Sequence, residues 1–258
     1  MIQPLAFRIR PKKIEDIIGQ KDILGPNGIL YNSIKEKLPI SFILYGAPGC
    51  GKTTIAECYA NSLGAHPIKI NAVSTNKTEL ENCIKEAKQY NPTILIIDEV
   101  HRLNKDKQDI LLPYIEDGTI YLIGATTSNP YIAINKAIRS RCHLLEVKRL
   151  STEDILVGLK KAILNPLGFN NNLKIDDESL KYIANISNGD FRFSLNFLEI
   201  LDLSFKNQNI DLEMTKSINK VPNLAMDRDE DDHYNAVSAL QKSIRGSDVN
   251  ASLHYLGR

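Results

Sequence analysis

The segment Gly46-Ala-Pro-Gly-Cys-Gly-Lys52-Thr53 decides the fold of this chain. It has the spacing GxxxxGK[ST], in which glycines let successive backbone N–H groups turn inward around phosphate oxygens. The lysine then reaches the outer phosphates, and the final hydroxyl binds Mg²⁺. Apolar residues 41–45 precede the segment and the helix-prone run 54–60 follows it, which is the setting that a phosphate-binding loop requires. The pattern predicts a protein that binds ATP and Mg²⁺.

A second nucleotide motif is the apolar run Thr93-Ile-Leu-Ile-Ile97, which ends in Asp98 and Glu99. Consecutive, mostly β-branched residues of this kind are typical of a buried parallel strand. We expect this strand to lie beside the phosphate loop, with Asp98 holding Mg²⁺ at the carboxyl end of the sheet. Glu99 is then the candidate general base, a group that a protein which only switches on nucleotide binding does not need.

The loop and the first turn of the following helix are expected to surround the phosphates. The predicted contacts are Gly46, Ala47, Pro48, Gly49, Cys50, Gly51, Lys52, Thr53 and Thr54. Thr53 and Asp98 are the predicted metal ligands. Because Cys50 lies between two glycines that approach phosphate, we expect alkylation of its thiol to clash with nucleotide.

The composition is that of an ordinary globular protein. The chain has 258 residues, 43% of them hydrophobic, and a net charge of +1, which neither requires nor excludes binding to nucleic acid. The apolar runs are strand-sized and the N-terminal residues lack the apolar region of a signal peptide, so a cytoplasmic location is expected. The four cysteines form neither a metal-ligand pattern nor a disulfide framework, which suits a reducing compartment.

Strand-like and helix-like segments alternate up to about Leu150, and this alternation predicts an α/β fold with a five-stranded parallel sheet. Beyond Leu150 the strand signal disappears. The expected strands are 41–45, 68–71, 93–97, 120–125 and 143–147, and the expected later helices are 151–165, 176–187 and 191–205. We therefore predict a nucleotide-binding domain (1–150), an all-α lid (151–206), a connecting segment (207–232) and a further helical region (233–258).

Further motifs resemble those of the clamp-loader-like branch of the AAA+ ATPases. Arg10-Pro11 and Ile17-Ile18-Gly-Gln resemble its adenine-binding segment, which implies that Pro11, Ile17 and Ile18 flank the base. Gly124-Ala-Thr-Thr127 resembles its sensor-one strand end, and the resemblance implies that Thr127 holds the attacking water.

Two more motifs of the same branch carry arginines. Ser140-Arg141-Cys142 resembles the signature whose arginine reaches into the nucleotide site of the neighbouring subunit. Gly189-Asp-Phe-Arg192 resembles the sensor-two signature, whose arginine descends from the lid onto the γ-phosphate of its own site. The resemblance thus implies a catalytic set made of Glu99, Thr127, Arg141 and Arg192.

Five longer strings are similar to the replication-associated recombination protein A family. They are Pro4–Pro11, Asp98–Lys105, Tyr114–Gly118, Gly124–Pro130 and His233–Asp248, and the similarity extends over essentially the whole chain. It implies a DNA-stimulated ATPase that acts in replication-fork maintenance, recombination and repair at the nucleoid. The implied partners are DNA, single-stranded-DNA-binding protein and further copies of the chain in a tetramer.

This sequence departs from the family pattern at two points. Cys50 stands where the family usually has threonine, and because backbone N–H groups make the phosphate contacts there, binding is expected to survive. Family members also continue beyond Arg258 with helices that build the oligomer. The resemblance therefore implies that 233–258 begins an incomplete oligomerisation domain, and that this truncated chain assembles weakly.

Two alternatives remain open at this point. The first alternative keeps the same fold but makes the chain a clamp-loader subunit or a branch-migration motor. An assay for loading a sliding clamp distinguishes these functions. The second alternative is a different class of protein, a non-hydrolysing scaffold whose shape is fixed by bound ATP. The intact catalytic set argues against this alternative, and the missing helices favour it. His101, which follows the acidic pair, is expected to pack or hydrogen-bond and is left out of the catalytic set.

Overall fold

The computed structural model describes residues 3–218, 240–246 and 249–256. The chain divides into two compact units, Met1–Lys216 and Ser217–Arg258. In the second unit, residues 240–245 are helical and α14 spans Val249–Leu256. The predicted connecting segment lies outside the described residues from 219 onward, as do residues 233–239 of the predicted helical region. Within the described ranges, no helix is long and apolar enough to cross a membrane.

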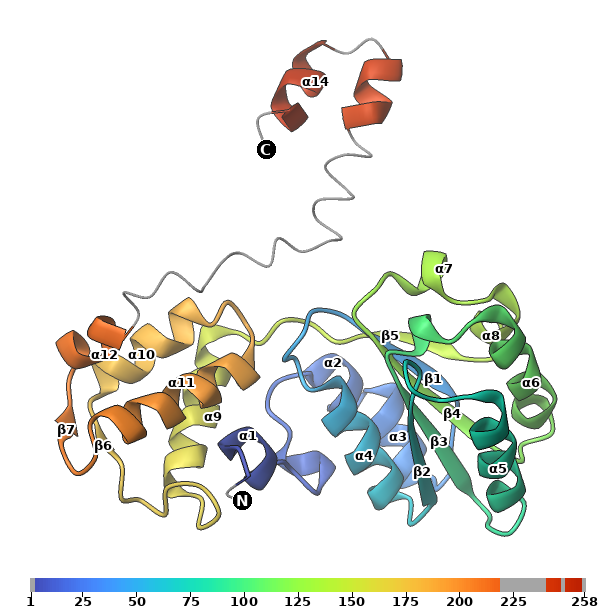
Figure 1. Ribbon diagram of the computed structural model, residues 1–258, viewed down its shortest axis with the longest axis horizontal. Helices are drawn as coiled ribbons and strands as arrows, with labels where there is room; N and C mark the ends of the chain where they lie inside the picture. Colours follow the sequence, from blue (N-terminus) through green and yellow to red (C-terminus); the bar gives the residue numbers. More distant parts are fainter. Residues whose placement is uncertain (1–2, 219–239, 247–248, 257–258) are drawn as a thin grey trace. The chain divides into compact units, whose positions relative to one another are not determined.

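The first unit contains a five-stranded parallel sheet with helices on both of its faces (Figure 1). Its strands are β1 (Phe42–Tyr45), β2 (His66–Asn71), β3 (Thr93–Asp98), β4 (Tyr121–Thr126) and β5 (His143–Glu146), in the order β2-β3-β4-β1-β5. This confirms the predicted α/β fold. Strand β4 lies between β3 and β1, the strand that enters the phosphate loop, and the carboxyl end of β3 still lies beside the loop, where Asp98 is 3.4 Å from the Thr53 hydroxyl. Crossover connections set the strand order, and apolar periodicity does not encode them.

Helices cover both faces of the sheet, which explains why the strands are continuous apolar runs. Ile94 and Ile96 of β3 pack in one core cluster with α3 (Ile29–Lys35) and α4 (Lys52–Ser62). Leu95 and Ile97 pack in the other with α5 (Lys77–Ala87), α6 (Lys105–Glu116) and α8 (Lys136–Arg139). Each buried isoleucine or leucine contributes about 1.5–3 kcal/mol, so the motif strand is held firmly from both sides.

Short elements complete this part of the unit. They are α1 (Leu5–Arg8), η1 (Ile14–Asp16), α2 (Lys21–Leu24), η2 (Val100–Arg102) and α7 (Pro130–Ala133). Asn104 caps the start of α6, because its side chain accepts a hydrogen bond from the Lys107 backbone N–H at 3.1 Å. The helix ends at Glu116, before Gly118 at φ +75°.

The lid follows in the same compact unit (Figure 1). Its helices are α9 (Thr152–Leu164), α10 (Asp177–Ile186) and α11 (Phe191–Ser204), and α12 (Leu212–Ile218) follows within the predicted connecting segment. Ser151 and Asp154 form a capping box at the start of α9, and Leu195, Leu198 and Leu201 on α11 are buried. The division at Leu150 between core and lid stays a prediction.

One feature of the lid differs from the sequence prediction. Strands β6 (Lys174–Ile175) and β7 (Asn209–Ile210) form a small parallel sheet beyond Leu150, where no strand was expected. Each strand has two residues, which is too short to show an alternation of apolar and polar side chains.

Candidate nucleotide-hydrolysis site

A cleft lies between the phosphate loop, the carboxyl ends of β3 and β4, the N-terminal segment and the lid. Its lining residues are Ala6, Ile9, Arg10, Pro11, Pro48, Gly49, Gly51, Lys52, Thr53, Thr54, Asp98, Glu99, Thr127, Phe191, Arg192 and Leu195. Most of the predicted site residues therefore meet in one place, although they come from segments far apart in the sequence.

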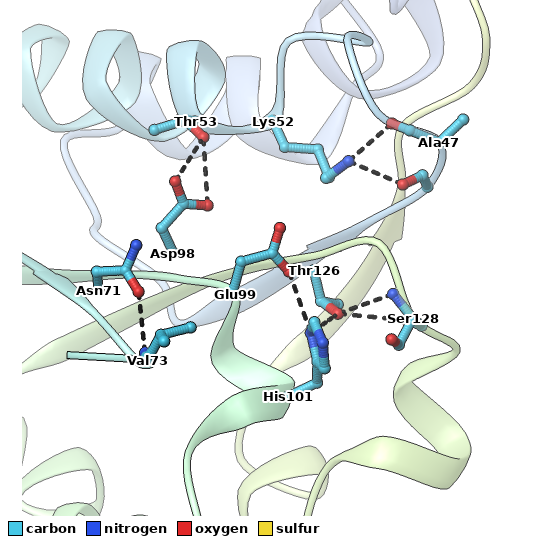
Figure 2. A network of polar contacts seen from close by, with 11 residues as sticks. Ala47, Lys52, Thr53, Asn71, Val73, Asp98, Glu99, His101, Thr126 and Ser128 are labelled. Atoms are coloured by element: carbon cyan, nitrogen blue, oxygen red, sulfur yellow. Dashed lines mark hydrogen bonds and ion pairs between the residues drawn. The ribbon is translucent and has the colours of Figure 1, made fainter. Parts of the chain in front are cut away.

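Lys52 begins α4 and is held under the loop. Its side chain is 9% exposed, and its Nζ donates hydrogen bonds to the carbonyl oxygens of Gly46 at 2.8 Å and Ala47 at 2.7 Å (Figure 2). Burial lowers the pKa of Lys52, and the positive charge of Arg192 lowers it further, whereas the carboxylates of Glu99 and Asp98 act in the opposite direction. The charges of Asp98, Glu99 and Arg192 therefore lie close enough to Lys52 to affect its protonation.

Gly49 is the point at which the lid meets the loop. It adopts φ +72°, and a Cβ at this position would collide with the carboxylate of Asp190, so only glycine fits. Asp190 also caps α11, because its Oδ1 accepts a hydrogen bond from the Phe193 backbone N–H at 2.8 Å. The same cap fixes the first turn of the helix that carries Arg192 into the cleft.

Thr53 and Asp98 provide oxygen atoms on adjacent sides of the cleft. The Thr53 hydroxyl lies 3.4 Å from both carboxylate oxygens of Asp98 (Figure 2). Mg²⁺ prefers oxygen ligands and is usually held by one or two protein groups together with water and phosphate oxygens. This pair fits that requirement, and the residues described contain no cluster of three or more histidine, cysteine or acidic side chains suited to a metal bound by protein alone.

Glu99 adopts a backbone conformation that is rare for its residue type. With φ +53° and ψ +44° it lies in the left-handed region, which costs a residue other than glycine about 1–3 kcal/mol. The turn η2 begins directly after it and brings His101 back toward its side chain. Nδ1 of His101 lies 3.2 Å from Oε2 of Glu99. Sequence reasoning missed this proximity, because the left-handed residue that produces it carries no signal in the sequence.

The two threonines at the end of β4 have different environments. Thr126 is fully buried and its Oγ1 lies 2.9 Å from Nδ1 of His101, whereas Thr127 lines the cleft. Of the two threonines, Thr127 is therefore the one whose side chain lies at the cleft, and its role in holding the attacking water stays a prediction.

Some predicted site residues do not line the cleft. Gly46 and Ala47 do not line the cleft, and their carbonyl oxygens accept hydrogen bonds from Nζ of Lys52. Ile17 packs against the core cluster that contains α4, and Ile18 packs against Gly158 of α9. These isoleucines support the cleft from outside, and direct contact of either with a base is not indicated by their positions.

The side chain of Cys50 points away from the site. The expected clash of an alkylated Cys50 with nucleotide stays a prediction, but the thiol itself is 3% exposed and belongs to the core cluster that includes α4. The reason is local. The glycines on either side take positive φ angles of +72° and +97°, and between them the chain turns the intervening side chain into the core.

Arg141 lies outside the cleft of its own chain. Its Nε donates to Oε1 of Glu116 at 2.7 Å and its Nη1 donates to the Ala137 carbonyl oxygen at 2.7 Å. One third of its side chain is exposed. This position is compatible with an arginine that serves a neighbouring site.

The structure adds apolar residues that the prediction lacked. Ala6 and Ile9 from the N-terminal segment, with Phe191 and Leu195 from α11, line the cleft beside Pro11. The signal for Ala6 and Ile9 was the string Pro4–Pro11, noted above only for its resemblance, whereas Phe191 and Leu195 lie in the predicted helix 191–205. Leu5 anchors this segment to the lid, since its backbone N–H donates to Oε1 of Glu199 at 3.0 Å.

The buried thiols lead to a prediction about reactivity. Burial raises the pKa of Cys58 to about 11 and that of Cys142 to about 12, and Cys50 is enclosed. Since the thiolate is the reactive form, the native protein should react slowly with maleimide at neutral pH, faster as pH rises toward these values, and at all four cysteines once unfolded. Mass spectrometry of labelled peptides checks this, and rapid native labelling of Cys50 would contradict its buried position.

Comparison with known protein families agrees with this site. Residues 42–149 match the ATPase family associated with various cellular activities (AAA), and residues 169–245 match an AAA C-terminal domain. Replication-associated recombination protein A of Bacillus subtilis is 47% identical over the whole chain, and that of Escherichia coli K12 is 39% identical over 99% of it. The chain belongs to the replication-associated recombination protein A family. It spans 63% and 60% of the length of these two relatives.

A eukaryotic protein is also similar to this chain, and the fold is shared more widely. ATPase WRNIP1 of Dictyostelium discoideum is 35% identical over 99% of the chain, which covers 32% of that protein. The solved structure of the Thermotoga maritima RuvB Holliday junction branch migration motor superposes with a TM-score of 0.71 at 24% identity, covering 97% of this chain and 86% of that one. This second likeness establishes the fold alone.

Proposed function

We propose that this member of the replication-associated recombination protein A family binds ATP with Mg²⁺ in the cleft and hydrolyses the γ-phosphate. The observation that carries the proposal is the convergence of three separate segments. Lys52 and Thr53 come from the loop and α4, the two carboxylates from the end of β3, and Arg192 from the lid. A glycine-rich turn or a solvated strand end, taken alone, would not bring these groups together.

Each group has a defined part in the proposed reaction. Lys52 places its positive charge on the outer phosphates, while Thr53 and Asp98 hold Mg²⁺, which when bound neutralises charge on those phosphates. Glu99 accepts the proton of the attacking water, and Thr127 orients that water. Arg192 approaches the γ-phosphate from the lid, so that nucleotide joins lid and core.

Arg141 is proposed to complete the site of an adjacent chain. It does not line the cleft of its own chain, and an arginine supplied in trans stabilises the charge of the transition state. Hydrolysis then depends on assembly. We propose that the chain associates with further copies of itself, with a tetramer as the assembly that the family implies, and that the strength of this association sets its turnover.

The proposed setting of the reaction is DNA. Two relatives are named for replication-associated recombination, and family membership supports DNA, with single-stranded-DNA-binding protein, as partners at the cytoplasmic nucleoid. DNA stimulates hydrolysis in this proposal by gathering chains. The fold does not separate this function from that of a clamp-loader subunit or a branch-migration motor. Loading of a sliding clamp, or migration of a four-way junction by the purified protein, would favour those alternatives.

Replacing Lys52 by alanine tests the binding part of the proposal. The substitution removes a charge-assisted contact worth about 1.5–3 kcal/mol, so affinity for ATP should fall by about 10- to 100-fold. Calorimetry with a non-hydrolysable ATP analogue measures it. The control is Lys77→Ala, which changes a largely exposed lysine on α5 away from the cleft. Equal affinity of the Lys52→Ala variant and the parent would exclude this cleft as the ATP site.

A further inference from the structure

His101 lies between two groups of the proposed site. Its side chain is 13% exposed, and its Nδ1 lies 2.9 Å from Oγ1 of Thr126 and 3.2 Å from Oε2 of Glu99 (Figure 2). Thr126 is fully buried at the end of β4, directly before Thr127. The imidazole therefore connects the candidate general base with the strand that presents Thr127 to the cleft.

The surroundings of Thr126 restrict how its hydroxyl is used. The backbone N–H of Ser128 donates to Oγ1 of Thr126 at 3.0 Å, and the same oxygen lies 3.5 Å from the Ser128 carbonyl oxygen. A threonine hydroxyl has one proton to donate and two lone pairs to accept with. It can accept from both Ser128 and His101 while its own proton is directed at the Ser128 carbonyl oxygen.

The carboxylate of Glu99 favours that same arrangement. An unprotonated Nδ1 would place its lone pair near a carboxylate oxygen 3.2 Å away, which is repulsive, whereas a protonated Nδ1 attracts that oxygen. Oε2 of Glu99 is enclosed by protein and makes no aligned hydrogen bond, so the dipole of the nearby His101 N–H is the group that orients it. Figure 2 shows the other oxygen of Glu99 pointing away from His101, toward the side on which Lys52 and Thr53 lie.

We propose that His101 is a positioning residue for Glu99: its Nδ1–H, anchored by Thr126, holds one carboxylate oxygen in place and leaves the other free to accept a proton from water. The proposal rests on the proposed role of Glu99 as general base. It also explains how a glutamate with a left-handed backbone keeps a single side-chain orientation. Contact of the imidazole with nucleotide is not required.

The tautomer of His101 can be measured without nucleotide. Ring-nitrogen chemical shifts distinguish a proton on Nδ1 from one on Nε2, and a His101→Asn spectrum assigns the signal among the five histidines. The proposal requires the proton on Nδ1 at neutral pH. A neutral ring that carries its proton on Nε2 alone would overturn it.

Paired substitutions test the effect on turnover. Asparagine places an amide nitrogen near the position of Nδ1, whereas glutamine places it near Nε2. His101→Ala and His101→Gln should lower kcat by about 10- to 100-fold, the range usual for residues that orient a reacting group, with ATP affinity unchanged. His101→Asn should recover most of the loss. If asparagine is no better than glutamine, or if all three variants keep the parent kcat, His101 does not position Glu99.

A second measurement separates positioning from folding. Thr126→Val removes the anchor, so it should lower kcat in the parent but add little in the His101→Ala background, since both changes break one unit. Thermal unfolding identifies any variant that fails to fold, and full additivity of the two changes would contradict the proposal. Parent-like turnover of Glu99→Gln would instead refute the general base itself. If Glu99→Gln loses activity while the His101 variants remain as active as the parent, the role of Glu99 stands and only the inference made for His101 is refuted.

Discussion

Arg141→Ala is expected to lower the maximal rate of ATP hydrolysis by about 10³- to 10⁵-fold, with little change in ATP affinity. An arginine presented in trans acts on charge that develops only in the transition state, and Arg141 does not line the cleft of its own chain. The measurement is kcat and KM at protein concentrations high enough for the parent rate to reach a plateau. A rate close to that of the parent would assign Arg141 to the surface of its own chain.

The control for this change is Glu116→Gln. Glu116 is the ion-pair partner of Arg141, and an exposed pair of this kind contributes about 0–1 kcal/mol to stability. The control should therefore hydrolyse ATP at nearly the parent rate. If it loses as much activity as Arg141→Ala, the arginine acts through local structure.

Mixing two inactive variants gives a direct test of action in trans. Arg141→Ala chains keep an intact cleft, whereas Lys52→Ala chains keep the arginine. An assembly that contains both should regain activity, because some clefts with Lys52 receive Arg141 from a neighbour. No recovery in demonstrated mixed oligomers would contradict an arginine supplied by the adjacent chain.

Glu99→Gln is expected to lower kcat by about 10²- to 10⁴-fold while ATP affinity is retained. The amide preserves the shape of the side chain but cannot accept the proton of the attacking water. Binding is measured by calorimetry and turnover by phosphate release. Glu86→Gln makes the same chemical change on an exposed residue of α5 that pairs with His66, and it should leave both quantities near the parent values. Hydrolysis by Glu99→Gln at the parent rate would exclude Glu99 as the base.

The sequence alone was sufficient for the sheet and for the centre of the site. The run 93–98 reads as a buried strand because helices cover both of its faces, and the loop motif places Lys52 and Thr53 at the start of a helix. Arg192 was predicted as a site residue only from its resemblance to a family signature. The periodicity of α11 does not distinguish a helix that reaches the cleft from one that only packs within the lid.

Other features depend on three-dimensional relations that residue patterns do not contain. Strand β4 separates β3 from β1, so Asp98 reaches Thr53 from two strands away and not from the adjacent one. The burial of Cys50 follows from the glycine conformations on either side of it. The approach of His101 to Glu99 follows from one left-handed residue, which alternation of apolar and polar side chains cannot reveal.

The most direct test of a cleft completed by a neighbouring chain is the specific ATPase activity as a function of protein concentration, with and without single-stranded DNA. Light scattering under the same conditions gives the state of association. The activity per chain should rise with concentration as chains associate, and DNA long enough to gather several chains should raise it at lower concentration. A monomer that hydrolyses ATP at a rate independent of concentration, with or without DNA, would contradict this mechanism.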